Sequence, residues 1–548
     1  MLTEIFCDKF MEHGNTRGRI LFHAGLNTVA GSDSGSNSIG KSTFLMIIDF
    51  VFGGDDYVEK LADVQKEVGD HDICFAFSFS DGRHYFRRSA SDYKYVLKCD
   101  ENYKPLDNGR LSVNQYLSFL QSQYGMNLPG LSFRNAIGRF MRIYKRENLD
   151  EKLPLHQAKA ENAKAAIEGL LRLTDLYAGI EEHYKIAAVA KDKCSAFKNA
   201  QKYQYIRSAS KKSEYDENSR QIAELAKQAD ELVSKSSGGL LDLDSMQAEQ
   251  ISYLKGKLSN LRRQRTRLTA NFQSLRADQE WSNRGFQNNY DILLRFFPGA
   301  NIQHIEDIEK FHKQLAQILQ KELSDNEKQF KAALSIVEQG INDIEAELAA
   351  MPNSSSLSKA VLEKFAEIDS KRKELQEAND NYIKKKELTD TSKAYEEKLN
   401  SFVAEQIAKM QQDINAEMLR INNVIYDGKK TAPSLSVTDA SHYSFSTPRD
   451  GGTGAQYKGL VVFDLAMMNL TCLPVIAHDS IVLKHIEDNA IEKIMELYSS
   501  SPKQIFIAID KESSYTPKTR QIIEDTKVLQ LAPGAGALFG RTWNDVKS

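Results

Sequence analysis

The sequence predicts an α/β head that is assembled from an N-terminal and a C-terminal lobe, with a long antiparallel coiled-coil arm inserted between them. Three observations predict this arrangement. Short apolar runs separated by turn residues fill residues 1–157 and again residues 427–548. Residues 158–426 are instead rich in Glu, Lys, Gln, Ala and Leu and contain little Gly or Pro. Apolar residues recur with a seven-residue period on both sides of the middle of that stretch.

The composition favours long solvated helices over many packed sheets. Of the 548 residues, 27% are charged and 9% are aromatic, and Pro occurs only 11 times. The net charge of −3 excludes a strongly basic protein, so any contact with DNA must come from a local patch. The five cysteines form no CxxC pair, and we expect reduced thiols rather than a zinc site. The charged N-terminus and the absence of a long apolar run predict a cytoplasmic protein without membrane contact.

Three clusters of helix-breaking residues divide the predicted arm. They lie near residues 234–245, 296–301 and 351–358, and the outer two are nearly equidistant from the middle one. A chain reversal near 296–301 would make that cluster the apex and the outer two a joint. The alternative is a helical bundle that is folded back at the joints.

The apolar spacing supports two arms that run antiparallel. The repeat residues step by 3 and 4 on both arms, with one step of 7 across Arg265. They are Ile251, Leu254, Leu258, Leu261, Leu268, Phe272 and Leu275 on one arm, and Phe330, Leu334, Val337, Ile341, Ile344 and Leu348 on the other. Their mirrored placement about the apex predicts an intramolecular coiled coil.

A phosphate-binding loop is predicted where GSNSIGKS follows a strand-like run and opens a helix. In such a loop, backbone N–H groups and the helix N-terminus surround phosphates, a lysine offsets their charge and a hydroxyl ligates magnesium. The alternative is a flexible Ser- and Gly-rich turn. The candidate nucleotide-binding residues are Gly35, Asn37, Ser38, Gly40, Lys41, Ser42 and Thr43.

A second motif, LPVIAHDS, predicts an apolar strand that ends at Asp479. A carboxylate at this place would hold the same magnesium ion as Ser42, so these two residues are the metal-ligand candidates. An ordinary buried strand with an Asp at its end is the alternative. Because neighbouring strand residues point to opposite faces, we expect His478 to be structural.

A Gly-rich turn, DGGTGAQY, opens an apolar helix between the arm and the second motif. Its helix N-terminus is able to donate to a phosphate, although Gly-rich turns before helices are common. The order of all these parts resembles the SMC-like ATPases, which are relatives of the chromosome-organising and double-strand-break-repair ABC ATPases. The segments GLNTVAG, IDFVFGGDDY, NAIGRFMRIYKREN, FFPGANIQHIEDIEKFHKQL and VIAHDS are similar to a bacterial family with a C-terminal domain of unknown function, associated with ABC-three-component and Lamassu-type anti-phage systems.

The resemblance implies an ABC-type ATPase head that dimerises, with ATP and Mg²⁺ between the phosphate loop of one copy and the signature of the other. By position, the signature in trans would comprise Gly452, Thr453, Gly454 and Gln456.

Three departures from the family pattern favour a slow ATPase. Ser480 stands where the catalytic Glu is expected, Asp510 and Lys511 stand at the place of the switch His, and the apex has no pair of hook cysteines. Another group would then have to orient the attacking water. The catalytic candidates are Asp479, Glu487 and Asp488.

Five basic residues crowd the segment that precedes the arm. They are Arg134, Arg139, Arg142, Lys145 and Arg146. In SMC-like heads this region lies near the arm roots and contacts duplex DNA, so we expect phosphate contacts here. The alternatives are a solvated helix face or ion pairs within the head.

The leading functional interpretation is an SMC-like ATPase subunit of an anti-phage complex. Its ATP-dependent head dimer would bind double-stranded DNA and control an effector, such as a nuclease, together with accessory subunits. Two alternatives stay open, namely a housekeeping ATPase for DNA repair or chromosome organisation, and a coiled-coil scaffold that binds ATP without cleaving it.

Overall fold

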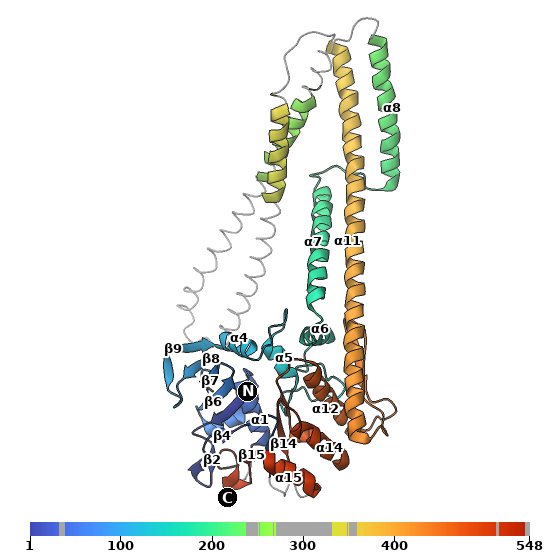
Figure 1. The fold of residues 1–548 in the computed structure, drawn as a ribbon. Coiled ribbons are helices and arrows are strands. Elements are labelled where there is room, and N and C mark those ends of the chain that lie inside the picture. The colour runs from blue at the N-terminus through green and yellow to red at the C-terminus, as the bar shows by residue number, and fades with distance from the viewer. Residues whose placement is uncertain are drawn as a thin grey trace, which may run out of the picture. The chain divides into compact units, whose positions relative to one another are not determined.

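The computed structural model divides the chain into two compact units (Figure 1). The described residues are 1–31, 39–236, 250, 253–266, 268–269, 331–347, 349, 359–510 and 514–542. The head unit comprises Met1–Lys185 and Glu397–Ser548, and the arm unit comprises Ile186–Glu396. The head unit extends beyond the predicted lobe boundaries, because buried residues of the arm roots such as Ile180 and Ile407 belong to its core.

A parallel five-stranded sheet joins the two lobes. Its strands follow the order β10-β13-β14-β5-β15, and every neighbouring pair runs parallel. Two strands come from the N-terminal lobe, β5 (Leu26–Ala30) and β10 (Met141–Arg142), and three come from the C-terminal lobe, β13 (Val475–His478), β14 (Gln504–Ile509) and β15 (Lys527–Gln530). Neither lobe forms this sheet alone, which confirms the predicted head of two lobes with an inserted helical arm.

An antiparallel sheet of the N-terminal lobe lies against helix α1 (Lys41–Val51). Its order is β4-β1-β6-β7-β8-β9, and two hairpins, β2-β3 and β11-β12, stand apart from it. The strands are β1 (Leu2–Phe6), β2 (Met11–Glu12), β3 (Asn15–Thr16), β4 (Ile20–Leu21), β6 (Asp72–Phe79), β7 (Gly82–Ser89), β8 (Tyr95–Cys99), β9 (Pro105–Ser112), β11 (Ser434–Asp439) and β12 (His442–Ser446). Nearly every residue of α1 is buried, since the helix contacts both β6 and β14.

The remaining helices of the head are mostly short. They are α2 (Asp56–Glu59), α3 (Ala62–Val68), α4 (Val113–Gln123), α5 (Phe133–Arg139), α6 (Ala163–Leu173), α12 (Thr453–Leu470), α13 (Ser480–Leu483), α14 (Asp488–Ser499), α15 (Pro517–Thr526) and the 3₁₀ turn η2 (Gly534–Gly536). The apolar helix α12 is buried along most of its length, as expected for a helix inside the core. No helix among the described residues is long and apolar enough to cross a membrane.

Long helices form the arm, but one break differs from the prediction. The helices are α7 (Ala178–Lys202), α8 (Lys212–Ser236) and α11 (Lys359–Tyr426). The sequence did not predict the interruption at 203–211, which packs on the unbroken α11 through a hydrogen bond of 3.1 Å from Ala209 N–H to Ala378 O. Most of the predicted break near 234–245, and all of those near 296–301 and 351–358, lie outside the described residues.

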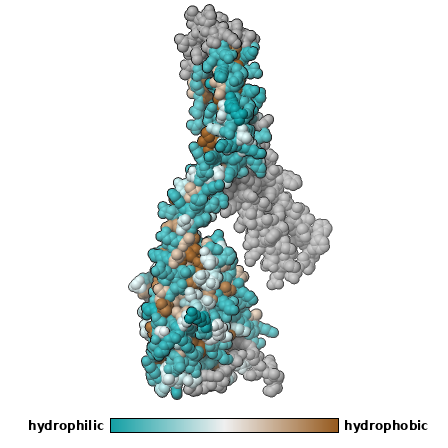
Figure 2. Space-filling view, turned by 90° about the vertical axis from the view of Figure 1, so that its right-hand side faces the viewer, coloured by the Kyte–Doolittle hydropathy of each residue, from teal (hydrophilic) through white to brown (hydrophobic). Residues whose placement is uncertain are grey.

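The predicted pairing of the two arm segments is confirmed for the described residues. Leu254 and Leu258 form a buried cluster with Ile341 and Ile344. Arg265, which the repeat placed at the seam, is exposed. The face drawn in Figure 2 is mostly hydrophilic. This agrees with an arm in which helices bury their apolar residues against one another.

One helix of this pair lies alongside α11. The ammonium group of Lys373 is 3.7 Å from the ring centroid of Tyr253, and the side chain of Gln264 donates to Tyr205 O at 3.5 Å. Tyr205 lies before α8 and Lys373 lies on α11, so both contacts join residues 253–266 to arm segments outside the coiled-coil pair. These contacts agree with the folded-back alternative.

A buried asparagine pair joins α8 to α11. Asn218 donates to the side-chain oxygen of Asn379 at 3.1 Å, and Asn379 donates to Tyr215 O at 3.1 Å and to Ser219 Oγ at 3.0 Å. Both asparagines are buried, so an unmade hydrogen bond would be costly. The pair therefore fixes the register between these helices, as single buried asparagines do in coiled coils.

We expect Asn379→Ala to loosen α8 by about 1–3 kcal/mol, because Asn218 loses its buried acceptor. Hydrogen exchange of the α8 amides measures the change. Asp380→Ala, which truncates an exposed neighbour, is the matched control and should leave the exchange rates nearly unchanged. Equal protection in both variants would show that the pair does not fix the register.

Candidate nucleotide site

A glycine in a left-handed backbone conformation caps the N-terminus of α1. Gly40 is the N-cap of α1 and has a φ of 101°, a left-handed conformation that favours glycine. A Cβ atom on Gly40 would lie 2.5 Å from Leu538 Cβ, and Leu538 N–H donates to Ile39 O at 3.0 Å. A side chain at residue 40 is therefore excluded both by the backbone conformation and by the packed C-terminal segment. Of the other predicted loop residues, Gly35, Asn37 and Ser38 lie outside the described residues.

Lys41 is a buried cation at the N-terminus of α1. Only 6% of the residue is exposed, and its Nζ lies 2.8 Å from Asp510 Oδ1. Asp510 follows β14, which pairs with β5, the strand that leads to α1. The carboxyl ends of these neighbouring parallel strands thus bring the two charges together.

The two metal-ligand candidates, Ser42 and Asp479, lie close together. The Ser42 hydroxyl is hydrogen-bonded to the Asp479 carboxylate, which also accepts from Tyr144 N–H at 2.9 Å and from Ser480 N–H at 2.7 Å. Burial raises the pKa of Asp479, although these hydrogen bonds oppose the shift. Asp479 N–H donates to Arg142 O at 2.9 Å, so β10 also fixes its position.

The donor atoms at this site fit Mg²⁺ and a phosphate group. A hydroxyl and a carboxylate supply the hard oxygen ligands that Mg²⁺ prefers. A buried lysine at the N-terminus of an 11-residue helix suits phosphate oxygens. Lys41 would therefore hold phosphate, and Ser42 with Asp479 would hold the cation. The next predicted residue, Thr43, is partly exposed on the first turn of the helix.

The predicted signature residues open α12. Gly452 is its N-cap, and both Gly452 and Thr453 are exposed. Gly454 passes close to the chain before α14, because a Cβ atom there would lie 2.7 Å from His485 O. Gln456 is buried and directs its amide to Asp450 O at 3.4 Å. The helix N-terminus is therefore accessible, whereas the Gln456 side chain is engaged within its own chain.

Neither of the two catalytic carboxylates proposed after Asp479 contacts it within the described part of the chain. Glu487 caps α14 and accepts from Lys430 Nζ at 2.5 Å. This hydrogen bond lowers the pKa of Glu487. Asp488 is exposed on the first turn of the same helix. Ser480 opens α13 beside Asp479 and supplies a backbone N–H to it.

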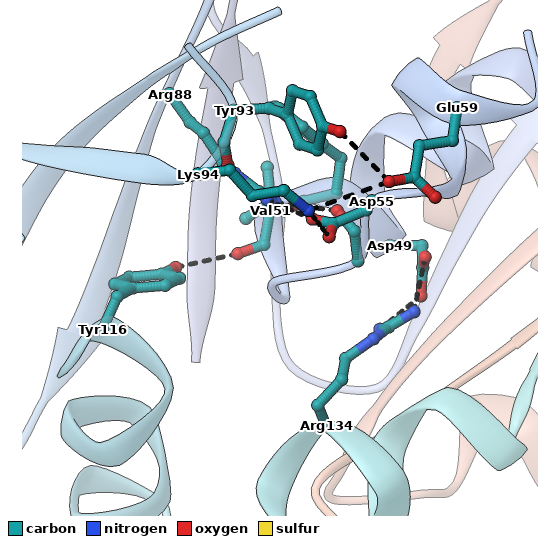
Figure 3. A network of polar contacts seen from close by, with 11 residues as sticks. Asp49, Val51, Asp55, Glu59, Arg88, Tyr93, Lys94, Tyr116 and Arg134 are labelled. Carbon is teal, nitrogen blue, oxygen red and sulfur yellow. Dashed lines mark hydrogen bonds and ion pairs between the residues drawn. The ribbon is translucent and has the colours of Figure 1, made fainter. Parts of the chain in front are cut away.

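Two of the arginines predicted to bind DNA instead pair with Asp49 of α1. Arg134 Nη1 lies 2.6 Å from Asp49 Oδ1 (Figure 3). Arg146 makes a second ion pair with the same oxygen. Asp49 is fully buried, which alone would raise its pKa, but the two guanidinium groups outweigh burial and lower it. Figure 3 also shows Arg88 and Lys94 directed at Asp55 just beyond α1.

The next two arginines also form ion pairs with carboxylates. Arg139 pairs with Glu161 at 2.6 Å, and Arg142 pairs with Asp464 of α12 at 2.8 Å. Arg142 donates in addition to Asn148 O and Pro154 O, at 2.9 and 2.7 Å.

The structure therefore corrects the DNA-binding assignment of four predicted arginines. Buried guanidinium groups whose charge is already paired are not available to phosphates. The corrected residues are Arg134, Arg139, Arg142 and Arg146. Of the five basic residues, only Lys145 is exposed. Its φ of 71° lies in the left-handed region, outside the range of a regular strand. The alternative of ion pairs within the head is the correct one for the arginines.

A buried series of polar groups links β10, α12, β13 and α14. Asp464 accepts from Arg142 and lies 3.0 Å from His478 Nε2, and His478 Nδ1 lies 2.6 Å from the Tyr498 hydroxyl. Asp464 is fully buried, yet the pair with Arg142 lowers its pKa. The expected structural role of His478 is confirmed. The sequence analysis missed Asp464, because a single Asp in an apolar helix gives no indication of its partners.

Lys458 joins α12 to the end of α11. Its Nζ donates to Asn422 Oδ1 at 2.9 Å and lies 5.2 Å from the ring centroid of Tyr426. Burial lowers the pKa of Lys458 to about 8, with smaller effects from Asp450, Lys430 and Glu487. The helix that carries the predicted signature residues is thus attached to the root of the arm through a buried amine.

Comparisons with known proteins give similarities at the level of fold and of the C-terminal lobe. Residues 420–543 match the family described as "Uncharacterised protein conserved in bacteria (DUF2326)", and these residues include α12, β13 and β14. A search of the curated proteins found no match.

Solved structures that align with the chain include Smc head domains. The head domain with a coiled coil and joint derived from Pyrococcus yayanosii is 15% identical with a TM-score of 0.46, and the alignment covers 98% of this chain and 96% of that one. The head domain with an extended coiled coil from Pyrococcus furiosus, bound to the C-terminal domain of ScpA, is 12% identical with a TM-score of 0.37, covering 98% and 94%. A SmcHead bound to the C-winged helix domain of ScpA is 9% identical with a TM-score of 0.39, covering 95% and 91%.

We expect Arg142→Met to lower the free energy of unfolding by about 3–5 kcal/mol, because Asp464 is left as a buried unpaired charge. Urea unfolding of the full chain measures the loss. Lys145→Met is the control, since it removes a nearby exposed cation and should change stability by less than about 0.5 kcal/mol. A similar small effect for both variants would contradict the role of the buried pair.

The buried amine of Lys458 predicts a pH dependence of stability. Its pKa in the folded chain is about 8 and its ordinary value is 10.5, so the unfolded chain binds more protons between these values. Stability should therefore rise with pH across this window. Lys458→Met should remove that part of the rise in thermal unfolding, whereas the exposed Lys484→Met should keep it. Identical pH profiles in both variants would contradict the assignment.

Proposed function

We propose that this chain is an SMC-like ATPase that binds ATP and Mg²⁺ in its head and works as a head dimer. One observation carries the proposal. Lys41, Ser42 and Asp479 converge at the carboxyl ends of parallel strands contributed by both lobes. A buried lysine, a hydroxyl and a carboxylate at a helix N-terminus form the set of groups that phosphoryl-transfer sites require.

Each residue has a defined role in the proposed mechanism. Lys41 and the N-terminus of α1 bind the phosphates, and Ser42 with Asp479 orient the metal side of the site. The bound Mg²⁺ supplies charge neutralisation at the phosphates. The exposed N-terminus of α12, with Gly452 and Thr453, faces solvent and is available to the phosphates held by a second copy. Dimerisation would then depend on ATP.

Turnover in this proposal is slow. The Ser480 hydroxyl cannot act as a general base at neutral pH. The Glu487 carboxylate is hydrogen-bonded to Lys430 rather than to a group near Asp479. The same observations favour a second candidate function, namely a coiled-coil scaffold that binds ATP and does not cleave it. The two candidates differ only in whether a group orients the attacking water.

We further propose that the head dimer binds double-stranded DNA and controls an effector, such as a nuclease, with accessory subunits in anti-phage defence. The family resemblance supports this role, and Lys145 is the exposed cation that remains from the predicted patch. A housekeeping role in DNA repair or chromosome organisation uses the same parts. DNA-stimulated turnover without a partner effector would favour that housekeeping role.

ATP binding and hydrolysis by the purified full chain, with and without linear duplex DNA, test the proposal. We expect slow hydrolysis that DNA increases. Lys41→Ala should weaken ATP binding at least about tenfold, which corresponds to about 1.4 kcal/mol. Lys66→Ala removes an exposed lysine of α3 and serves as the matched control.

The outcomes separate the candidates. ATP binding that requires Lys41 but gives no hydrolysis supports the scaffold. Equal ATP affinity in the wild type and in Lys41→Ala, or no binding in either, contradicts the nucleotide site. Hydrolysis that DNA does not change contradicts the DNA part of the proposal alone.

A further inference from the structure

Asp510 is a carboxylate beside the proposed nucleotide site to which the proposed function assigns no role. Its side chain is 25% exposed, and its Oδ1 lies 2.8 Å from Nζ of the buried Lys41. The backbone fixes this approach, because Ala30 pairs with Ile509 and Gly31 N–H donates to Ile509 O at 3.0 Å. The strand pair therefore positions Asp510, and the first turn of α1 positions Lys41.

Gly31 leaves the space that this ion pair occupies. A Cβ atom on Gly31 would lie 2.7 Å from Asp510 Oδ1 and 3.1 Å from Lys41 Nζ. Contacts below 3.0 Å require a neighbour to move, so a larger residue at this position is incompatible with the ion pair as it stands. Gly31 therefore leaves room for Lys41 and Asp510 to pair in the observed geometry.

Lys41 has one positive charge, whereas both Asp510 and a phosphate at the N-terminus of α1 are anionic. A lysine has three N–H donors and can contact two anions. The two anions nevertheless repel each other at such distances, and the repulsion is strong in a poorly solvated site. The carboxylate of Asp510 therefore makes the free energy of binding a phosphate at Lys41 less favourable.

We propose that Asp510 competes with the phosphates of ATP for Lys41 and thereby sets the affinity of the head for nucleotide. This inference rests on the proposed ATP site. ATP binding loosens the Lys41–Asp510 pair, and loss of ATP restores it. Asp510 is a positioning residue in this scheme, since it acts through Lys41 and not on the phosphates themselves.

The proposal differs in its kinetic consequences from a role for Asp510 in activating water. A competitor raises the dissociation constant and KM for ATP, so its removal lowers both. A water-orienting carboxylate acts in the transition state, so its removal lowers kcat and leaves ATP binding unchanged. Asp510→Asn separates these roles, because the amide keeps the shape of the side chain and removes its charge.

Calorimetric titration of the full chain with ATP and Mg²⁺ provides the test. We expect Asp510→Asn to bind ATP about tenfold more tightly than the wild type, with a matching decrease in KM if turnover is measurable. Asp510→Glu keeps the charge and should stay near the wild-type affinity. Asp525→Asn neutralises an exposed carboxylate of α15 and controls for the change in net charge.

Each outcome has a distinct meaning. Unchanged or weaker ATP binding by a folded Asp510→Asn, while the wild type binds ATP through Lys41, overturns the competition and leaves the nucleotide site intact. Tighter binding in both Asp510→Asn and Asp525→Asn also overturns it, because the effect would then follow from net charge. Failure of the wild type to bind ATP contradicts the proposed function itself, and the competition with it.

Discussion

The pairing of β5 with β14 is the constraint on which the rest of the head depends. It joins strands near the two ends of the sequence, with Ala30 opposite Ile509. Since β5 lies between β14 and β15 of the C-terminal lobe, and β10 pairs with β13, the sheet is completed only after the arm has returned the chain. These strands also position the polar site, because Lys41 follows β5, Asp510 follows β14 and Asp479 follows β13. A parallel sheet gathers its carboxyl ends at one edge, so the long insertion does not separate these residues in space.

Buried charge is the second organising feature, and ion pairs between side chains of the head compensate for it. Arg142 and Asp464 are both fully buried, as is Asp49 between Arg134 and Arg146. An ion removed from water is costly unless a partner and further hydrogen bonds replace its solvation. Here carboxylates and backbone carbonyl groups supply them, for example at Asn148 O and Pro154 O. Such pairs connect elements that carry little apolar surface of their own, including the two-residue strand β10.

The sequence predicted those features that follow from local spacing. The motif around Lys41 and the strand ending at Asp479 each have their own local pattern, and a parallel sheet brings them together. The arginine cluster failed as a predictor because its partners, Asp49, Glu161 and Asp464, are distributed through the chain and give no local signal. The interruption at 203–211 was missed for a similar reason. It contains neither Gly nor Pro and is stabilised by contacts with α11.

The contacts of the head also connect the candidate nucleotide site to the root of the arm. Ser42 bonds to Asp479, whose N–H donates to Arg142 O, and the Arg142 side chain holds Asp464 on α12. Further along the same helix, Lys458 donates to Asn422 of α11. Apart from Ser42, the groups in this series are buried, and Asp464 and Lys458 are joined by the helix that carries both. Helix α12 therefore joins the candidate site to the root of the arm, because it carries Asp464 opposite Arg142 and Lys458 opposite Asn422.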